Sequence, residues 1–234
     1  KANTALAFVS LSKDGNRTFS FYRKPSADML LEKDSIEKKW FDDCYAIHFC
    51  SVSLGDFPMR DAHESAIEYA REKSAIVSFD PNLRFQLWDN TENLKKAVDK
   101  FIPMADILKI SDEELGFITG KSDIKEALPE LFRGNVKLVI FTCGSEGAYA
   151  FTRNAEAFSP SVKVRAVDTT GAGDGFIGSF LWGLKNAGIT VDKLESLDSE
   201  FLNRIIEFSN EFCASVQSAG AIDSYPAISQ MKSM

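Results

Sequence analysis

The sequence predicts an α/β fold, with a mostly parallel, doubly wound sheet, helices on both faces and a small β lid. Short β-rich runs alternate with helical segments along most of the chain, which is typical of parallel sheets. One of these runs, VKLVIFT at 136–142, is continuously apolar, as expected of a strand buried on both faces. The beginning of the chain differs, because it has the pattern of a β-hairpin.

That hairpin is predicted from two extended runs around a turn. Leu6, Phe8 and Ser10 alternate with Ala5, Ala7 and Val9. SKDGN supplies an Asp-Gly turn, and the second run covers 18–23. A hairpin fits poorly into a parallel sheet, so we expect a separate flap. We treat 1–234 as a single domain, with a lid hairpin at about 4–24 and an α/β core at about 25–234. A strand that begins near residue 4 has nothing before it to pair with, so we expect the full protein to carry a further N-terminal segment.

The core segments follow in regular order. After Pro25 a short polar helix is expected around Ile36 and Trp40. The predicted strands are 45–50, 75–80, 106–110, 136–142 and 162–167. Helices are expected after the first three strands, the third of them capped by Ser111 with Glu114 three residues later. Further helices are expected after residue 174 and over 198–217. We place His48 in a buried strand and give it no chemical role.

Composition narrows the functional class. The 234 residues are 44% apolar and 26% charged, which is ordinary for a globular protein. The chain contains no apolar run of the ~18 residues that a membrane span needs, and its start lacks the pattern of a signal peptide. A formal net charge of −7 argues against a nucleic-acid or anionic-membrane partner. The four cysteines have no metal-ligand spacing, so we expect reduced thiols and a cytoplasmic location.

The strongest chemical signal is the segment DTTGAGD at 168–174. A glycine-bearing turn at a helix N-terminus exposes unpaired N–H groups and the positive end of the helix dipole, which together bind phosphate. Asp174 at the same end would repel a phosphate that merely binds there. It makes sense as a base that takes a proton from an attacking hydroxyl while the amides hold the transferred phosphoryl group. The alternative is that Asp174 is a helix N-cap.

DTTGAGDGF resembles the C-terminal signature of the ribokinase-like (phosphofructokinase-B type) sugar kinases, and the resemblance covers essentially the whole chain. It implies a ribokinase-like fold, ATP as phosphoryl donor, and a lid that closes over a sugar. In that family the last Asp of the signature, here Asp174, is the catalytic base. The anion hole is then formed by Gly171, Ala172, Gly173 and Asp174.

The same resemblance implies a nucleotide site. The segment 142–147 resembles the family's nucleotide-binding turn, with Thr142, Gly144, Ser145 and Gly147 as the candidates; a plain hairpin turn is the alternative. Asn210 matches a position near the family's adenine, although a single Asn on a helix is more often solvated.

Two ion sites are also implied. The segment 109–114 resembles the family's strand end that serves phosphate and Mg²⁺-bound water; Ser111 stands in place of the usual Asn, and Glu114 could instead serve only in a capping box. A monovalent cation, K⁺, often lies beside the family's anion hole. The matching positions here are Asp168, Thr170, Gly220 and Ser224.

The sugar is predicted from the lid and one strand end. Residues 19–28, with Tyr22 and Arg23, resemble the lid strand of bacterial fructokinases and of ketodeoxygluconate kinases. Arg84 in DPNLR is implied to point at the sugar or phosphate; a surface ion pair is the alternative. Fructose is the first choice, ketodeoxygluconate the second and ribose the third. A catalytically silent sugar or nucleotide sensor of the same fold is a hypothesis of another class. We also expect a homodimer formed through the lid.

Overall fold

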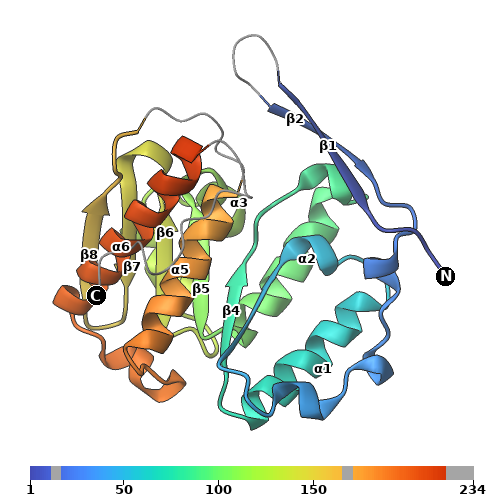
Figure 1. The fold of residues 1–234 in the computed structure, drawn as a ribbon, viewed down its shortest axis with the longest axis horizontal. Coiled ribbons are helices and arrows are strands. Elements are labelled where there is room, and N and C mark those ends of the chain that lie inside the picture. Colours follow the sequence, from blue (N-terminus) through green and yellow to red (C-terminus); the bar gives the residue numbers. More distant parts are fainter. Residues whose placement is uncertain (12–16, 165–170, 220–234) are drawn as a thin grey trace.

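The computed structural model describes residues 1–11, 17–164 and 171–219. Its centre is one six-stranded sheet in the order β3-β4-β5-β6-β7-β8 (Figure 1). The first four strands are parallel, and β7 and β8 continue the sheet antiparallel. Their bounds are Ala46–Cys50, Ile76–Asp80, Ile107–Ser111, Leu138–Thr142, Gly147–Phe151 and Glu156–Pro160. The predicted mostly parallel α/β sheet is confirmed.

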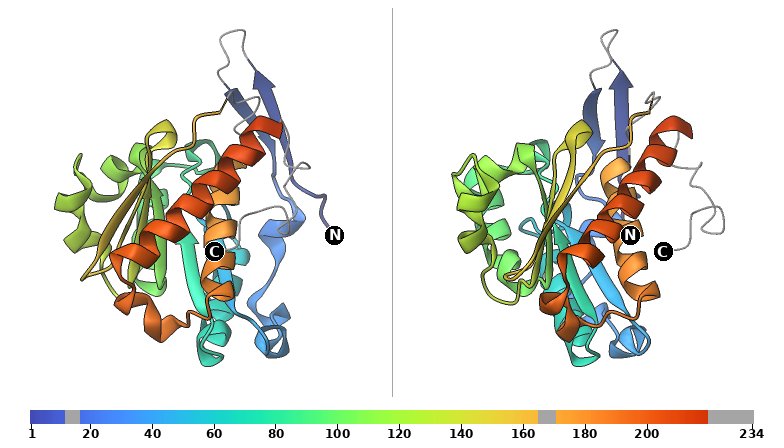
Figure 2. Two further views of the ribbon diagram at one scale, coloured as in Figure 1. Left: turned by 60° about the vertical axis from the view of Figure 1, so that its left-hand side comes forward. Right: turned by 90° about the vertical axis from the view of Figure 1, so that its left-hand side faces the viewer.

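Helices cover both faces of this sheet, as predicted (Figure 2). One layer contains α1 (Met59–Glu72), α2 (Thr91–Phe101), α3 (Asp112–Thr119) and α4 (Ile124–Leu131). The other contains α5 (Ala172–Asn186) and α6 (Ser199–Ala219). Neighbouring strand residues serve opposite layers: Val139 packs with the first set of helices and Ile140 with the second. This two-sided burial explains the continuous apolar run of β6.

The N-terminal hairpin forms the predicted lid. Strands β1 (Leu6–Leu11) and β2 (Arg17–Tyr22) pair antiparallel, with Leu6 opposite Tyr22. The hairpin stands out beyond the body of the molecule (Figure 1). Phe19 and Phe21 are partly buried, whereas Tyr22, on the opposite face, is 69% exposed. The inner face of the lid is therefore aromatic.

Three local predictions are wrong. The helix expected after Pro25 is replaced by short 3₁₀ turns at Ala27–Leu30, Lys33–Ser35 and Lys38–Phe41. Of the strand expected at 162–167, the described residues 162–164 are not in a strand, and the chain instead forms β7 and β8 earlier. His48 does not lie in a buried strand, because β3 is an edge strand of the described sheet and leaves this side chain exposed. Within the residues that the structure describes, no helix has the length and apolar character needed to cross a membrane.

Candidate active site

The predicted site residues gather where the parallel strands end. The carboxyl ends of β3, β4, β5 and β6 lie side by side at one edge of the sheet. The first turn of α5 reaches this edge, since a β-carbon built on Gly173 would lie 3.8 Å from Nζ of Lys109 on β5. Open α/β sheets bind their ligands at this edge.

The start of α5 has the backbone geometry of an anion-binding site. Gly171 is its N-cap and has φ 79°, a left-handed conformation that glycine adopts without strain. The first intrahelical bond runs from Gly175 N to Gly171 O, at 2.7 Å. The amides of residues 172–174 therefore have no acceptor within the helix. Exposed amides at the positive end of a 15-residue helix bind phosphate well.

Asp174 lies in the first turn of this helix. The N-cap alternative is wrong, because Gly171 occupies the cap and Asp174 is the third helical residue. Its side chain is exposed and has no hydrogen-bond or ion-pair partner in the described part of the chain. A free carboxylate beside unpaired amides can accept a proton from a hydroxyl bound there.

A buried ion pair lies beneath this turn. Lys109 Nζ donates to Asp80 Oδ2 at 2.6 Å, and both side chains are 7% exposed. The other oxygen, Asp80 Oδ1, accepts from Asn82 N at 3.1 Å and shapes the loop after β4. Burial alone lowers the pKa of Lys109, but Asp80, and then Glu114 and Asp174, raise it above its usual range. Lys109 is therefore a fixed, buried ammonium.

Glu114 fastens two segments of the site edge. Its Oε2 accepts from Ser111 N at 2.9 Å, which gives the predicted capping-box contact, and its Oε1 accepts from Leu83 N at 2.7 Å. Burial, and then the Asp80 carboxylate, raise the pKa of Glu114. Glu114 thus holds the loop after β4 against the start of α3. Its proposed link to magnesium stays a prediction.

The segment 142–147 forms the hairpin turn between β6 and β7, the alternative considered above. Gly147 has φ 128°, and a β-carbon there would lie 2.2 Å from Ser159 O. Gly144 has φ 51° with open space around it. The Gly147 position is therefore explained by close packing of β7 on β8, while nucleotide contacts of Thr142, Gly144, Ser145 and Gly147 stay predictions.

Asn210 lies on α6 and is only 7% exposed, so the solvated-helix alternative is wrong. Its Nδ2 donates to Ser159 O at 3.0 Å and to Pro160 O at 3.2 Å, which ties α6 to the end of β8. Both amide hydrogens are used in these bonds. The predicted adenine contact would therefore have to use Oδ1.

The lid meets the core through two arginines. Arg23 is 9% exposed, donates from Nε to Asp28 Oδ2 at 2.9 Å and from Nη1 to Val52 O at 2.7 Å. It therefore anchors the base of the lid, and its predicted contact with sugar stays a prediction. The Arg84 guanidinium carbon lies 5.5 Å from the ring centre of Phe19. Of the two partners that the surface ion-pair alternative offers to Arg84, Asp80 and Asp89, Asp80 is bound to Lys109 instead.

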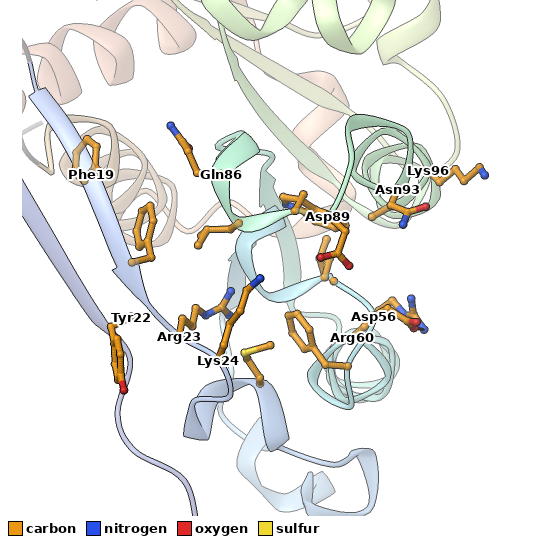
Figure 3. Close-up of a pocket in the computed structure, with 18 of the residues that line it drawn as sticks. Phe19, Tyr22, Arg23, Lys24, Asp56, Arg60, Gln86, Asp89, Asn93 and Lys96 are labelled. Atoms are coloured by element: carbon orange, nitrogen blue, oxygen red, sulfur yellow. Dashed lines mark hydrogen bonds and ion pairs between the residues drawn. The ribbon is translucent and has the colours of Figure 1, made fainter.

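A cleft of about 920 Å³ opens between the lid and the core (Figure 3). The inner face of β2 forms one wall, and Trp88, Leu54 and Phe57 belong to the other. Asp174 is not among the residues that line it. Tyr22 points away from the centre of this cleft (Figure 3), in keeping with its exposure. The predicted cation ligands Asp168, Thr170, Gly220 and Ser224 lie outside the described residues.

Comparison with known proteins agrees with this geometry. The model of the pfkB family of carbohydrate kinases matches residues 1–228. The chain belongs to this family. Among pfkB relatives, it is 40% identical over 228 residues to "Probable fructokinase-2" of Arabidopsis thaliana, covering 96% of this chain and 68% of that protein. The predicted family, ribokinase-like fold and sugar-kinase class are confirmed.

Solved structures give the same result. Fructokinase with bound ATP from Xylella fastidiosa superposes with a TM-score of 0.89 at 32% identity, covering 98% of this chain and 72% of the other. A double mutant of fructokinase from Vibrio cholerae O395, with fructose, ADP and a potassium ion bound, gives 0.81 at 31% identity, covering 95% and 70%. Both share the fold of this chain at more than 30% sequence identity.

Two charged residues of the site received no role from the sequence. Asp80 closes a strand in which all five residues are buried, and Lys109 interrupts the buried run of β5. A buried charge is costly unless it is paired. A lysine inside one apolar strand and an aspartate at the end of another are the signal that could have indicated the pair.

Proposed function

We propose that this chain carries the catalytic part of an ATP-dependent fructokinase, which transfers the terminal phosphoryl group of ATP to the hydroxymethyl group of fructose. The products are fructose 6-phosphate and ADP. The observation that carries the proposal is the exposed Asp174 carboxylate in the first turn of α5, which has no partner within the described ranges and lies beside amides that have no acceptor within the helix. Names of relatives and structural neighbours favour fructose as the sugar.

In this mechanism Asp174 accepts the proton of the sugar hydroxyl as its oxygen attacks the terminal phosphorus. The bond from that phosphorus to the bridging oxygen of ADP breaks, and the amides of residues 172–174 hold the charge on the transferred group. Gly171 makes the tight turn that orients these amides. A closed lid excludes water, which would otherwise accept the phosphoryl group.

The ions are proposed on narrower grounds. Mg²⁺ is usually held by substrate phosphates, water and one or two carboxylates. Each Glu114 oxygen accepts one backbone hydrogen bond and keeps a second lone pair, so this carboxylate fits a water-mediated link to magnesium. For K⁺ we keep the predicted ligand set; the potassium ion bound in the Vibrio cholerae structure supports the choice of ion.

For sugar selection we propose that Arg84 is the main cation that contacts the sugar, and that the inner face of the lid covers the bound sugar. Arg84 lies against Phe19, so the loop after β4 and the lid meet at one point. Arg23 is committed to Asp28 and Val52 and acts through the position of the lid strand. We further propose a homodimer formed through the lid, whose residues Leu6 and Phe8 are 51% and 58% exposed, and a cytoplasmic location.

The test is an ADP-release assay of the full-length protein with fructose, ketodeoxygluconate and ribose. Our proposal predicts the highest kcat/KM with fructose. Preference for ketodeoxygluconate would contradict the choice of sugar and leave the kinase mechanism intact. Binding of sugar or nucleotide without ADP release would favour the sensor hypothesis.

A further inference from the structure

Lys109 has a position that pairing with Asp80 alone does not explain. Its side chain leaves β5 at the site edge, and its Nζ lies close enough to the α5 turn that a β-carbon on Gly173 would be 3.8 Å away. The ammonium is thus fixed on one side by Asp80 at 2.6 Å and faces the backbone of the anion hole on the other.

The negative charges around Lys109 outnumber its single positive charge. Three carboxylates act on its pKa, those of Asp80, Glu114 and Asp174. Asp80 and Glu114 are buried and also accept backbone hydrogen bonds, whereas Asp174 is exposed. The phosphates of a nucleotide would add more negative charge at the same turn. Amide dipoles and one buried cation are the means by which such a site tolerates this charge.

We propose that Lys109 is a positioning residue for phosphoryl transfer, whose buried ammonium supports the turn 171–174 from below and offsets the charge of Asp174 and the phosphates. This inference rests on the proposed kinase function. Lys109 does not touch the reacting atoms; it acts through the turn and through its field. The alternative is that Lys109 serves only to neutralise Asp80 in the core.

The two possibilities separate in a neutral double variant. Lys109→Met leaves the Asp80 carboxylate buried without its cation, which destabilises the fold in either case. In Asp80→Asn/Lys109→Met both charges are gone, and the retained Oδ1 still accepts from Asn82 N. Neutral replacements of buried ion pairs often restore stability. Only a positioning role predicts that activity stays low after stability returns.

The experiment measures the unfolding midpoint, kcat, KM for each substrate and the affinity for ADP, in the full-length protein. We expect Lys109→Met to lower the midpoint and to reduce kcat roughly 10- to 100-fold, less than loss of a donor that touches the transition state. In the double variant the midpoint should recover and kcat should stay reduced. Lys109→Arg keeps the charge, so its kcat should exceed that of Lys109→Met; this comparison decides the question where the double variant does not fold.

The control is a second ion pair, at the opposite edge of the sheet, between Arg71 of α1, which is 32% exposed, and the buried Asp106 just before β5. Arg71→Met should lower the midpoint with kcat within about twofold of the parent, because its charge is far from the reaction. Recovery of kcat together with stability in the double variant, or an equal loss of kcat in Arg71→Met, would overturn the role of Lys109. Absence of turnover in the parent protein would instead contradict the proposed function.

Discussion

A buried carboxylate is paired with a cation near each end of β4 and β5, and the two ends differ in what lies beside the pair. At the amino end, Asp106 is 1% exposed and accepts from Val77 N at 2.9 Å and from Arg71 Nη1 at 3.4 Å. Arg71 also donates to Met104 O at 2.5 Å. At the carboxyl end, the Lys109 and Asp80 side chains are both 7% exposed, and beside this pair Asp174 has no hydrogen-bond or ion-pair partner in the described segments.

The difference indicates that the polar groups at the amino edge are satisfied within the fold, whereas the carboxyl edge keeps polar groups that a ligand can satisfy. The carboxylates of Asp106 and Asp80 each meet protein donors on both oxygens, so both charges serve the fold. At the carboxyl end, the amides of residues 172–174 have no acceptor within the helix, and the exposed Asp174 carboxylate has no partner among the described residues. Groups left unsatisfied at the mouth of a sheet are those that a substrate can complete. Changes at the two edges should therefore affect different properties.

The largest expected effect is that of Asp174→Asn. It should lower kcat by roughly 10²- to 10⁴-fold, the usual range for a general base. The midpoint of thermal unfolding should change little, because the exposed carboxylate has no partner among the residues described here. Steady-state ADP release and calorimetry test both expectations. Turnover within about threefold of the parent would show that Asp174 is not the base.

Gly147→Ala should have the next largest effect, on stability. The new β-carbon would lie 2.2 Å from Ser159 O at φ 128°, so we expect a loss of roughly 2–4 kcal/mol in the free energy of unfolding. Gly144→Ala is the matched control, with open space and φ 51°; it should cost about 1 kcal/mol. Urea titration of both variants measures the difference. Equal losses would mean that packing on β8 does not fix Gly147.

Arg71→Met tests the amino edge of β4 and β5, where Arg71 pairs with Asp106. Loss of the cation leaves Asp106 buried without it, but Arg71 is partly exposed, so we expect about 1–2 kcal/mol of destabilisation. Urea titration measures this loss of stability, and ADP release below the unfolding midpoint measures kcat. A specific loss of kcat with an unchanged midpoint would break the comparison between the two edges.

Cys213 should give the smallest effect. Burial raises the pKa of its thiol to about 12, so it stays protonated at neutral pH and its Sγ donates to Ala172 O at 3.0 Å. Cys213→Ala removes this link between α6 and the start of α5 and should cost about 0.5–1 kcal/mol. Cys213→Ser keeps a donor and serves as the control. A greater loss for Ser than for Ala would indicate that packing, not the hydrogen bond, is what matters.

Much of the fold could be predicted because its signals are local. The apolar run 136–142 and the strand–helix alternation indicate the parallel sheet, and the Asp-Gly turn indicates the lid. The sequence does not predict β7 and β8, because their small and alternating residues give a weaker strand pattern than the later run 162–167. The three 3₁₀ turns after Pro25 have helical spacing but bury only one of their side chains, Phe41, so too few core contacts form there to stabilise a full helix.

The site was predicted from one motif and could not be completed from the sequence. Asp174 and Gly171 belong to one contiguous segment, so the sequence alone shows that they are close together. Lys109 and Asp80 come from different strands, and only the parallel pairing of β4 with β5 brings them together. Arg23 illustrates the reverse case: the lid segment of the sequence indicates its place directly after β2, but its partners Asp28 and Val52 depend on the tertiary fold.

The most direct test of the central claim is a crystal structure of the full-length protein with ADP and fructose. Our account predicts that the terminal phosphate of ADP lies toward the amides of residues 171–174. The fructose hydroxymethyl oxygen should lie within hydrogen-bond distance of the Asp174 carboxylate. Phosphates bound away from the start of α5, or a sugar hydroxymethyl group out of reach of Asp174, would contradict the account.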